Sequence, residues 1–111
     1  RPQQAVEEAF RALQDAEPLS PLQVRAQLLL SRLAAATGRL VEALAFALAA
    51  RATAAASGMD RLERSASDLL AVHLRTGGWT AVSELASALA AHGVDVYEYL
   101  DLAELISPVR E

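Results

Sequence analysis

The chain contains no cysteine, no lysine and few aromatic residues, and each absence narrows the interpretation. Without cysteine there are no disulfides and no thiolate ligands for a metal, which fits a cytoplasmic protein. Aromatic residues fill only 5% of the 111 positions, so the core has to be built from leucine, valine and the 25 alanines. Because alanine lets helices approach closely, we expect a tightly packed helical core.

Charge and hydropathy argue against two classes of partner. The net charge is −4, the wrong sign for a surface that neutralises phosphates, so we expect no direct nucleic-acid binding. The longest apolar run, residues 43–50, is far shorter than the roughly 20 residues of a membrane helix. The chain begins with Arg1 and shows no signal-peptide pattern, so we expect a segment of a longer protein that does not enter a membrane.

Apolar residues recur at the helical period throughout the chain, and no segment alternates with a period of two. This pattern predicts an all-α fold of about six helices, at residues 2–16, 21–37, 39–57, 60–76, 79–92 and 95–106. Glycine or proline lies at the breaks between these segments. The connections are short, which predicts antiparallel helical hairpins.

Each predicted helix has one apolar stripe that we expect to face the core. In the segment 21–37 this stripe consists of Leu22, Ala26, Leu29, Leu30 and Leu33. In the segments 60–76 and 79–92 the expected core includes His73 and Trp79.

A short motif recurs at the start of two of these helices. Gly38, Leu40, Glu42 and Ala43 open the segment 39–57, and Gly77 is followed by Trp79 at the matching positions 39 residues later. Ala9 precedes Ala43 by 34 residues in a similar context. The pattern resembles the tetratricopeptide repeat, whose second helix opens with a glycine, a bulky residue and then Glu-Ala.

The resemblance implies a short right-handed solenoid of stacked hairpins in a single domain, residues 1–111. It divides the chain into a half repeat (2–16), two repeats (21–57 and 60–92) and a capping helix (95–106). Ala47 and Ala86 depart from the repeat pattern, which usually has bulky residues there. Longer hairpins rich in alanine and arginine are similar to those of large bacterial transcription activators of the maltose-regulator type, and of multidomain signalling proteins.

No combination of residues predicts catalysis, a metal site or a bound cofactor. Ser67, Asp68 and His73 do not form a triad, because Ser67 and His73 lie on different faces of one helix. The pair Gly77–Gly78 has no phosphate-binding motif around it. Clustered Cys, His or carboxylate ligands at metal-binding spacing are missing from the sequence.

Arginines provide the candidate binding site. In repeats of this type the first helix of each hairpin lines a concave groove. The resemblance places six residues there: Arg25, Leu28, Arg32, Arg64, Ser67 and Arg75. Guanidinium groups suit the carboxylates of a peptide. The alternative is that these arginines are solvated, or pair with Glu63 and Asp68.

The sequence therefore favours a non-catalytic protein-interaction module in a larger regulatory protein, binding a protein or peptide in the groove. Two alternatives stay open. An effector-sensing domain would hold a small molecule in a pocket between hairpins. A self-associating module would use the apolar end faces of the array to form a homo-oligomer.

Overall fold

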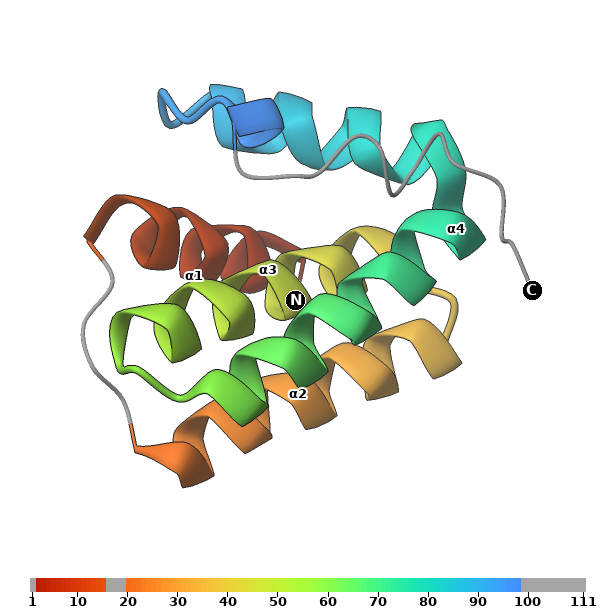
Figure 1. Cartoon of the computed structure of the whole chain (residues 1–111). Helices are drawn as coiled ribbons and strands as arrows, with labels where there is room; N and C mark the ends of the chain where they lie inside the picture. The colour runs from red at the N-terminus through yellow and green to blue at the C-terminus, as the bar shows by residue number, and fades with distance from the viewer. Residues whose placement is uncertain (1, 16–19, 99–111) are drawn as a thin grey trace.

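A computed structural model describes residues 2–15 and 20–98 (Figure 1). These residues form four α-helices and a short 3₁₀ helix, and they include no strand, which confirms the predicted all-α fold. The elements are α1 (Pro2–Asp15), α2 (Pro21–Ala36), α3 (Leu40–Ala56), α4 (Asp60–Ala90) and η1 (Val96–Glu98).

Local signals in the sequence set the ends of α2 and α3. At the start of α2 the Gln23 backbone N–H donates to Ser20 Oγ at 3.3 Å, and the Ser20 N–H donates to Gln23 Oε1 at 2.9 Å. This reciprocal capping box satisfies two N–H groups that the helix itself leaves unpaired. Gly38 and Gly58 follow α2 and α3 with φ of +79° and +70°, a conformation that glycine adopts without strain.

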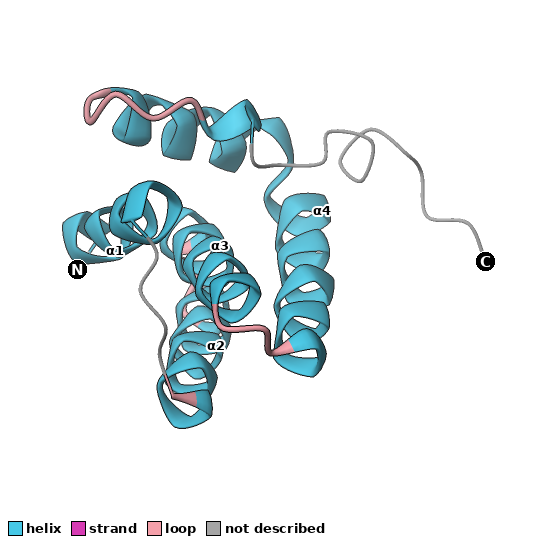
Figure 2. Ribbon diagram, turned by 60° about the vertical axis from the view of Figure 1, so that its left-hand side comes forward, coloured by secondary structure: helices cyan, strands magenta, loops and turns pink. Residues whose placement is uncertain are grey.

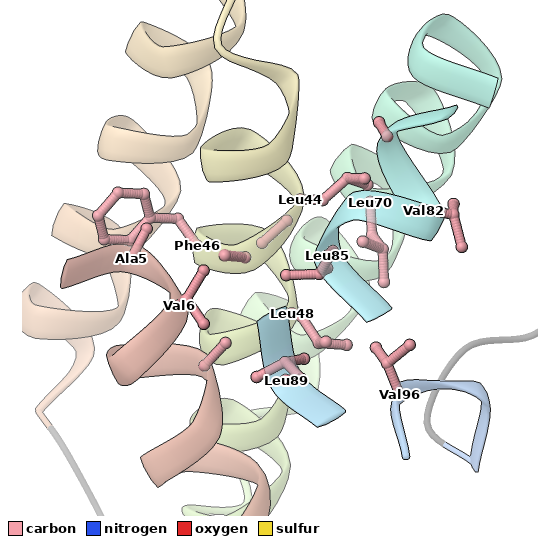
Figure 3. Close-up of a cluster of buried hydrophobic side chains, with 14 of the residues drawn as sticks. Ala5, Val6, Leu44, Phe46, Leu48, Leu70, Val82, Leu85, Leu89 and Val96 are labelled. Atoms are coloured by element: carbon pink, nitrogen blue, oxygen red, sulfur yellow. The ribbon is translucent and has the colours of Figure 1, made fainter. Parts of the chain in front are cut away.

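The helix α3 lies at the centre of the molecule. It contacts α1, α2 and α4, and every residue from 42 to 50 is buried. Alanine fills most of these positions, so neighbouring helices pack closely against several sides of α3. Buried residues of α1, α3 and α4 form the main cluster (Figure 3), and α2 contributes to a second one.

The predicted break between residues 76 and 79 is wrong, because α4 is one helix from Asp60 to Ala90. The helix instead bends sharply in its middle part, and its second half folds back over α1 and α3 (Figures 1 and 2). A Cβ atom placed on Gly77 would lie 2.7 Å from the Ala81 Cβ, whereas residues four apart in a straight helix have Cβ atoms about 5–6 Å apart. Glycine therefore permits the bend without ending the helix.

Only the start of the predicted sixth helix is described. Val96–Glu98 form the 3₁₀ helix η1, with Val96 in the main cluster. The rest of the predicted capping helix lies outside the described residues. The solenoid arrangement stays a prediction.

Candidate functional site

The six predicted groove residues do not share one environment. Arg25 and Arg32 of α2, and Arg64 and Arg75 of α4, are exposed, whereas Ser67 is half-buried; the sixth, Leu28, is only 3% exposed. It packs in the cluster shared by α2, α3 and α4, so its placement in a groove was wrong. The orientation of α2 is the reason, since the face that carries Leu28 lies against α3.

The apolar stripe predicted for the core side of α2 points the other way. Four of its leucines are well exposed: Leu22 (74%), Leu29 (55%), Leu33 (54%) and Leu30 (44%). The opposite face is buried instead, through Val24, Gln27, Leu28, Ser31 and Ala34. The predicted core face of α2 was therefore wrong, and the helix presents a row of leucines on the surface.

We call this surface the leucine face: Leu22, Leu29, Leu30 and Leu33, bordered by Arg25 and Arg32. Leu22, Ala26, Leu29 and Leu33 are spaced alternately by four and three residues, which is the spacing of a coiled-coil seam. The α2 sequence contains both arginines and no carboxylate. Leu30 and Leu33 also border a hollow of about 270 Å³ that reaches Gln4 and Glu8 of α1. The leucine face thus combines apolar side chains, positive charge and a recess.

Buried hydrogen bonds hold α2 in this orientation. Ser31 Oγ donates to the carbonyl oxygen of Ala43 at 2.7 Å and lies 2.9 Å from Nε2 of His73. The hydroxyl has a single hydrogen, so Nε2 of His73 has to carry a proton and donate it to Ser31. Three helices are joined at this point. A second buried contact links Gln27 of α2 to Thr53 of α3, with 3.0 Å between the Gln27 Oε1 and Thr53 Oγ1 atoms.

His73 is a core residue, as predicted from its place on an apolar stripe. Burial lowers its pKa below the ordinary value of 6.5, and the positive charge of Arg32 lowers it further. The ring is therefore neutral at pH 7 and acts as a hydrogen-bond donor in the core.

A larger hollow lies between α1, the start of α3 and the second half of α4. Its volume is about 880 Å³. Backbone and side chains from all three helices line it: Val6, Glu7, Gly38, Arg39, Leu40, Val41, Glu42, Gly77, Thr80, Ala81, Glu84, Ala88 and His92. The ring of His92, at one edge, packs 4.8 Å from the ring of Phe10, measured between centroids.

Charge is unevenly distributed in this hollow. Glu7, Glu42 and Glu84 bring one carboxylate from each of α1, α3 and α4. An Arg39 guanidinium nitrogen lies 3.6 Å from Glu42 Oε1. Among the described residues that line the hollow, Arg39 is the single arginine beside three carboxylates, so this lining has a net negative charge.

Trp79 was expected in the core, but its side chain is 51% exposed. The repeat position that predicted burial assumes a separate hairpin helix beginning near Gly77. In the bent α4, Ala81, Val82 and Leu85 point into the core instead.

Sequence reasoning missed both the leucine face and the larger hollow. The sequence did contain one signal for the leucine face, because Leu28 and the predicted apolar stripe lie on different faces of α2. Gly77 was noticed as a break, but its role as one wall of a hollow depends on how α4 bends.

The described residues contain no group of three or more His, Cys, Asp or Glu side chains able to hold a metal ion. Within the same part of the chain, no helix combines the length and apolar character needed to cross a membrane. The sequence matches no family model, no curated protein and no solved structure.

Proposed function

We propose that the protein is a non-catalytic interaction module that binds an acidic, amphipathic helix of a partner protein on the leucine face. The observation that carries this proposal is the exposure of four leucines along one side of α2. Burying one such side chain fully is worth about 1.5–3 kcal/mol, so covering several of them provides a substantial driving force for association. Contiguous apolar surface of this kind commonly marks a protein-binding site.

The geometry of α2 favours a helix as the bound element. Leucines spaced by four and three residues form a straight seam that fits the seam of a second helix. The hollow beside Leu30 and Leu33 can accept a large apolar side chain from that helix.

Charge favours a partner with carboxylates beside its apolar stripe. Arg25 and Arg32 border the leucine face and do not line the hollow that Glu8 reaches, and α2 itself has no acidic residue to neutralise them. Guanidinium groups at the rim of an interface attract carboxylates and raise the association rate. A second copy of this chain fits less well, because pairing two leucine faces brings four arginines to one seam.

The tetratricopeptide-like arrangement and a place in a larger, cytoplasmic bacterial regulator belong to the same proposal. Their support is the Gly-x-bulky-x-Glu-Ala motif that begins at Gly38, because Gly77 lies inside α4 and opens no separate helix. Arg64, Ser67 and Arg75 lie on α4, so they are not part of the leucine face. Of the six residues that the sequence predicts for a groove, Arg25 and Arg32 border the leucine face.

Fluorescence anisotropy with a labelled helical peptide tests this proposal. The peptide has about 21 residues, with leucine at heptad positions a and d and glutamate at e and g. We expect saturable binding that weakens at least about tenfold in the double variant Leu29→Gln/Leu33→Gln. The control is Val72→Gln, which replaces an exposed apolar side chain on α4 and should leave binding unchanged.

Two further comparisons separate the alternatives. Arg25→Gln/Arg32→Gln should weaken binding by about threefold to fivefold, whereas Arg64→Gln/Arg75→Gln should not. A peptide with lysine in place of glutamate should bind more weakly than the acidic one. Equal binding of both peptides, or loss only in the Arg64/Arg75 variant, would contradict the proposed surface. Concentration-dependent dimerisation abolished by Leu29→Gln/Leu33→Gln, without peptide binding, would instead assign the face to self-association.

A further inference from the structure

The larger hollow is a candidate binding site of a different kind from the leucine face. We propose that it binds a small organic cation with an apolar body, such as an aryl-alkyl amine. The inference goes beyond the proposed protein-binding function, because it concerns another surface and another class of ligand. It rests on the shape of the hollow, its apolar walls and its charge.

The bend of α4 creates the space. Gly77 contributes only backbone atoms to the wall of the hollow, and Ala81 and Ala88 contribute only methyl groups. Larger apolar side chains, among them Leu40 and Val41 of α3, also line the hollow. The volume of about 880 Å³ falls within the range of roughly 300–1,000 Å³ that small-molecule sites occupy.

The carboxylates determine the sign of the ligand. The charge of Glu42 is offset by Arg39, whose guanidinium lies 3.6 Å away, so the net negative charge of the lining comes from the other two carboxylates. Glu7 and Glu84 are exposed, and they come from the other two helices that line the hollow, α1 and α4. An ammonium group between these helices would meet carboxylates from both, whereas a carboxylate or phosphate ligand would be repelled.

Binding in this hollow would also stabilise the bent form of α4. The ligand would contact Gly77 and Glu84, which lie at the bend and in the second half of the helix, together with α1 and α3. A ligand that binds one conformation shifts the population towards it. The hollow therefore couples ligand binding to the position of the second half of α4.

Three probes of similar size separate charge from apolar contact: 4-phenylbutylamine as a cation, 4-phenylbutanol as a neutral analogue and 4-phenylbutyrate as an anion. Each is titrated into the ¹⁵N-labelled full chain and followed by amide chemical shifts. We expect saturable shifts from the amine at Gly77, Thr80, Ala81 and Glu84. The alcohol should bind about fivefold more weakly, and the anion more weakly still.

The variant Glu7→Gln/Glu84→Gln tests the carboxylates, and both residues are exposed, so the fold should be kept. It should bind the amine about fivefold more weakly and the alcohol as before. The control Asp60→Asn/Asp68→Asn removes the same charge from exposed positions that do not line the hollow, and should change neither affinity.

Several outcomes would overturn the proposal. Equal affinity for the amine and the anion would show that charge plays no part. Shifts at α2 instead of the bend, or no saturable shift up to about 10 mM, near the weak limit for a specific site, would show that the hollow is not the binding site. Equal weakening of amine binding in the Asp60/Asp68 control would show that the effect comes from the net charge of the protein and not from the carboxylates of the hollow. The leucine face is tested with a different ligand and different variants, so the two proposals fail independently.

Discussion

The two faces of α2 differ in a way that its composition does not suggest. The exposed face carries four leucines, while the face packed against α3 carries Gln27, Ser31 and Ala34 beside Val24 and Leu28. Two factors explain this orientation. Small side chains let α2 approach α3 closely, and the buried polar groups have hydrogen-bond partners there. The comparison shows that the more apolar face of a helix need not be its packed face.

Two adjacent leucines give the sharpest test of this comparison and the largest expected effect. Leu28→Ala should lower the free energy of unfolding by about 3 kcal/mol, because it leaves a cavity in the core. Leu29→Ala, on the exposed face, should change it by less than about 0.5 kcal/mol. Urea denaturation followed by circular dichroism measures both. Equal losses in the two variants would mean that α2 is turned differently from the orientation described.

An intermediate effect is expected at the buried hydroxyl of Ser31. The variant Ser31→Ala leaves the N–H at His73 Nε2 without its acceptor and removes a second donor from the Ala43 carbonyl, which keeps its hydrogen bond within α3. Leaving the buried N–H of His73 without a partner should cost about 2 kcal/mol. The exposed Ser87→Ala provides a matched control, with no expected loss. If Ser31→Ala were as stable as the control, these hydrogen bonds would not be what orients α2.

The smallest effect is a pH dependence of stability that originates at His73. Its pKa is lower in the folded protein than in the unfolded chain, so the unfolded chain binds more protons as the pH falls. The stabilising contribution of the neutral ring is complete above the unfolded pKa of about 6.5. It decreases as the pH falls from there towards the lower folded value.

Urea titrations at several pH values measure this contribution. His73→Gln keeps an N–H donor at a comparable position but does not titrate. The variant should therefore show a flatter dependence between pH 7 and the folded pKa of His73. A variant with the same slope as the wild type would place the titrating group elsewhere.

Local sequence signals predicted the first three helices well. Ser20, Pro21 and Gln23 specify the start of α2, and Gly38 and Gly58 end α2 and α3, because these effects depend only on residues near each terminus. The same reasoning failed at Gly77. Two consecutive glycines weaken a helix but do not forbid it, so packing against α3 decided that the helix bends and continues.

The candidate sites were less accessible from sequence. Arg25 and Arg32 were identified as surface cations, and both lie beside the leucine face. The sequence predicts Leu28 at the surface and the neighbouring leucines in the core, and the structure shows the reverse. Both faces of α2 carry apolar residues, so the sequence pattern alone does not decide which face is packed. The larger hollow joins Glu7, Glu42 and Glu84 from three helices, and no spacing along the chain predicts that meeting.

The sequence by itself determined the all-α class, the ends of the first helices and the burial of His73. Periodicity, capping residues and composition act over a few residues, so they can be read without knowing the fold. Only the tertiary structure decided which face of α2 is packed and how α4 bends over α3. Those outcomes depend on close approach and hydrogen bonds between helices, above all those that join Ser31 to Ala43 and His73.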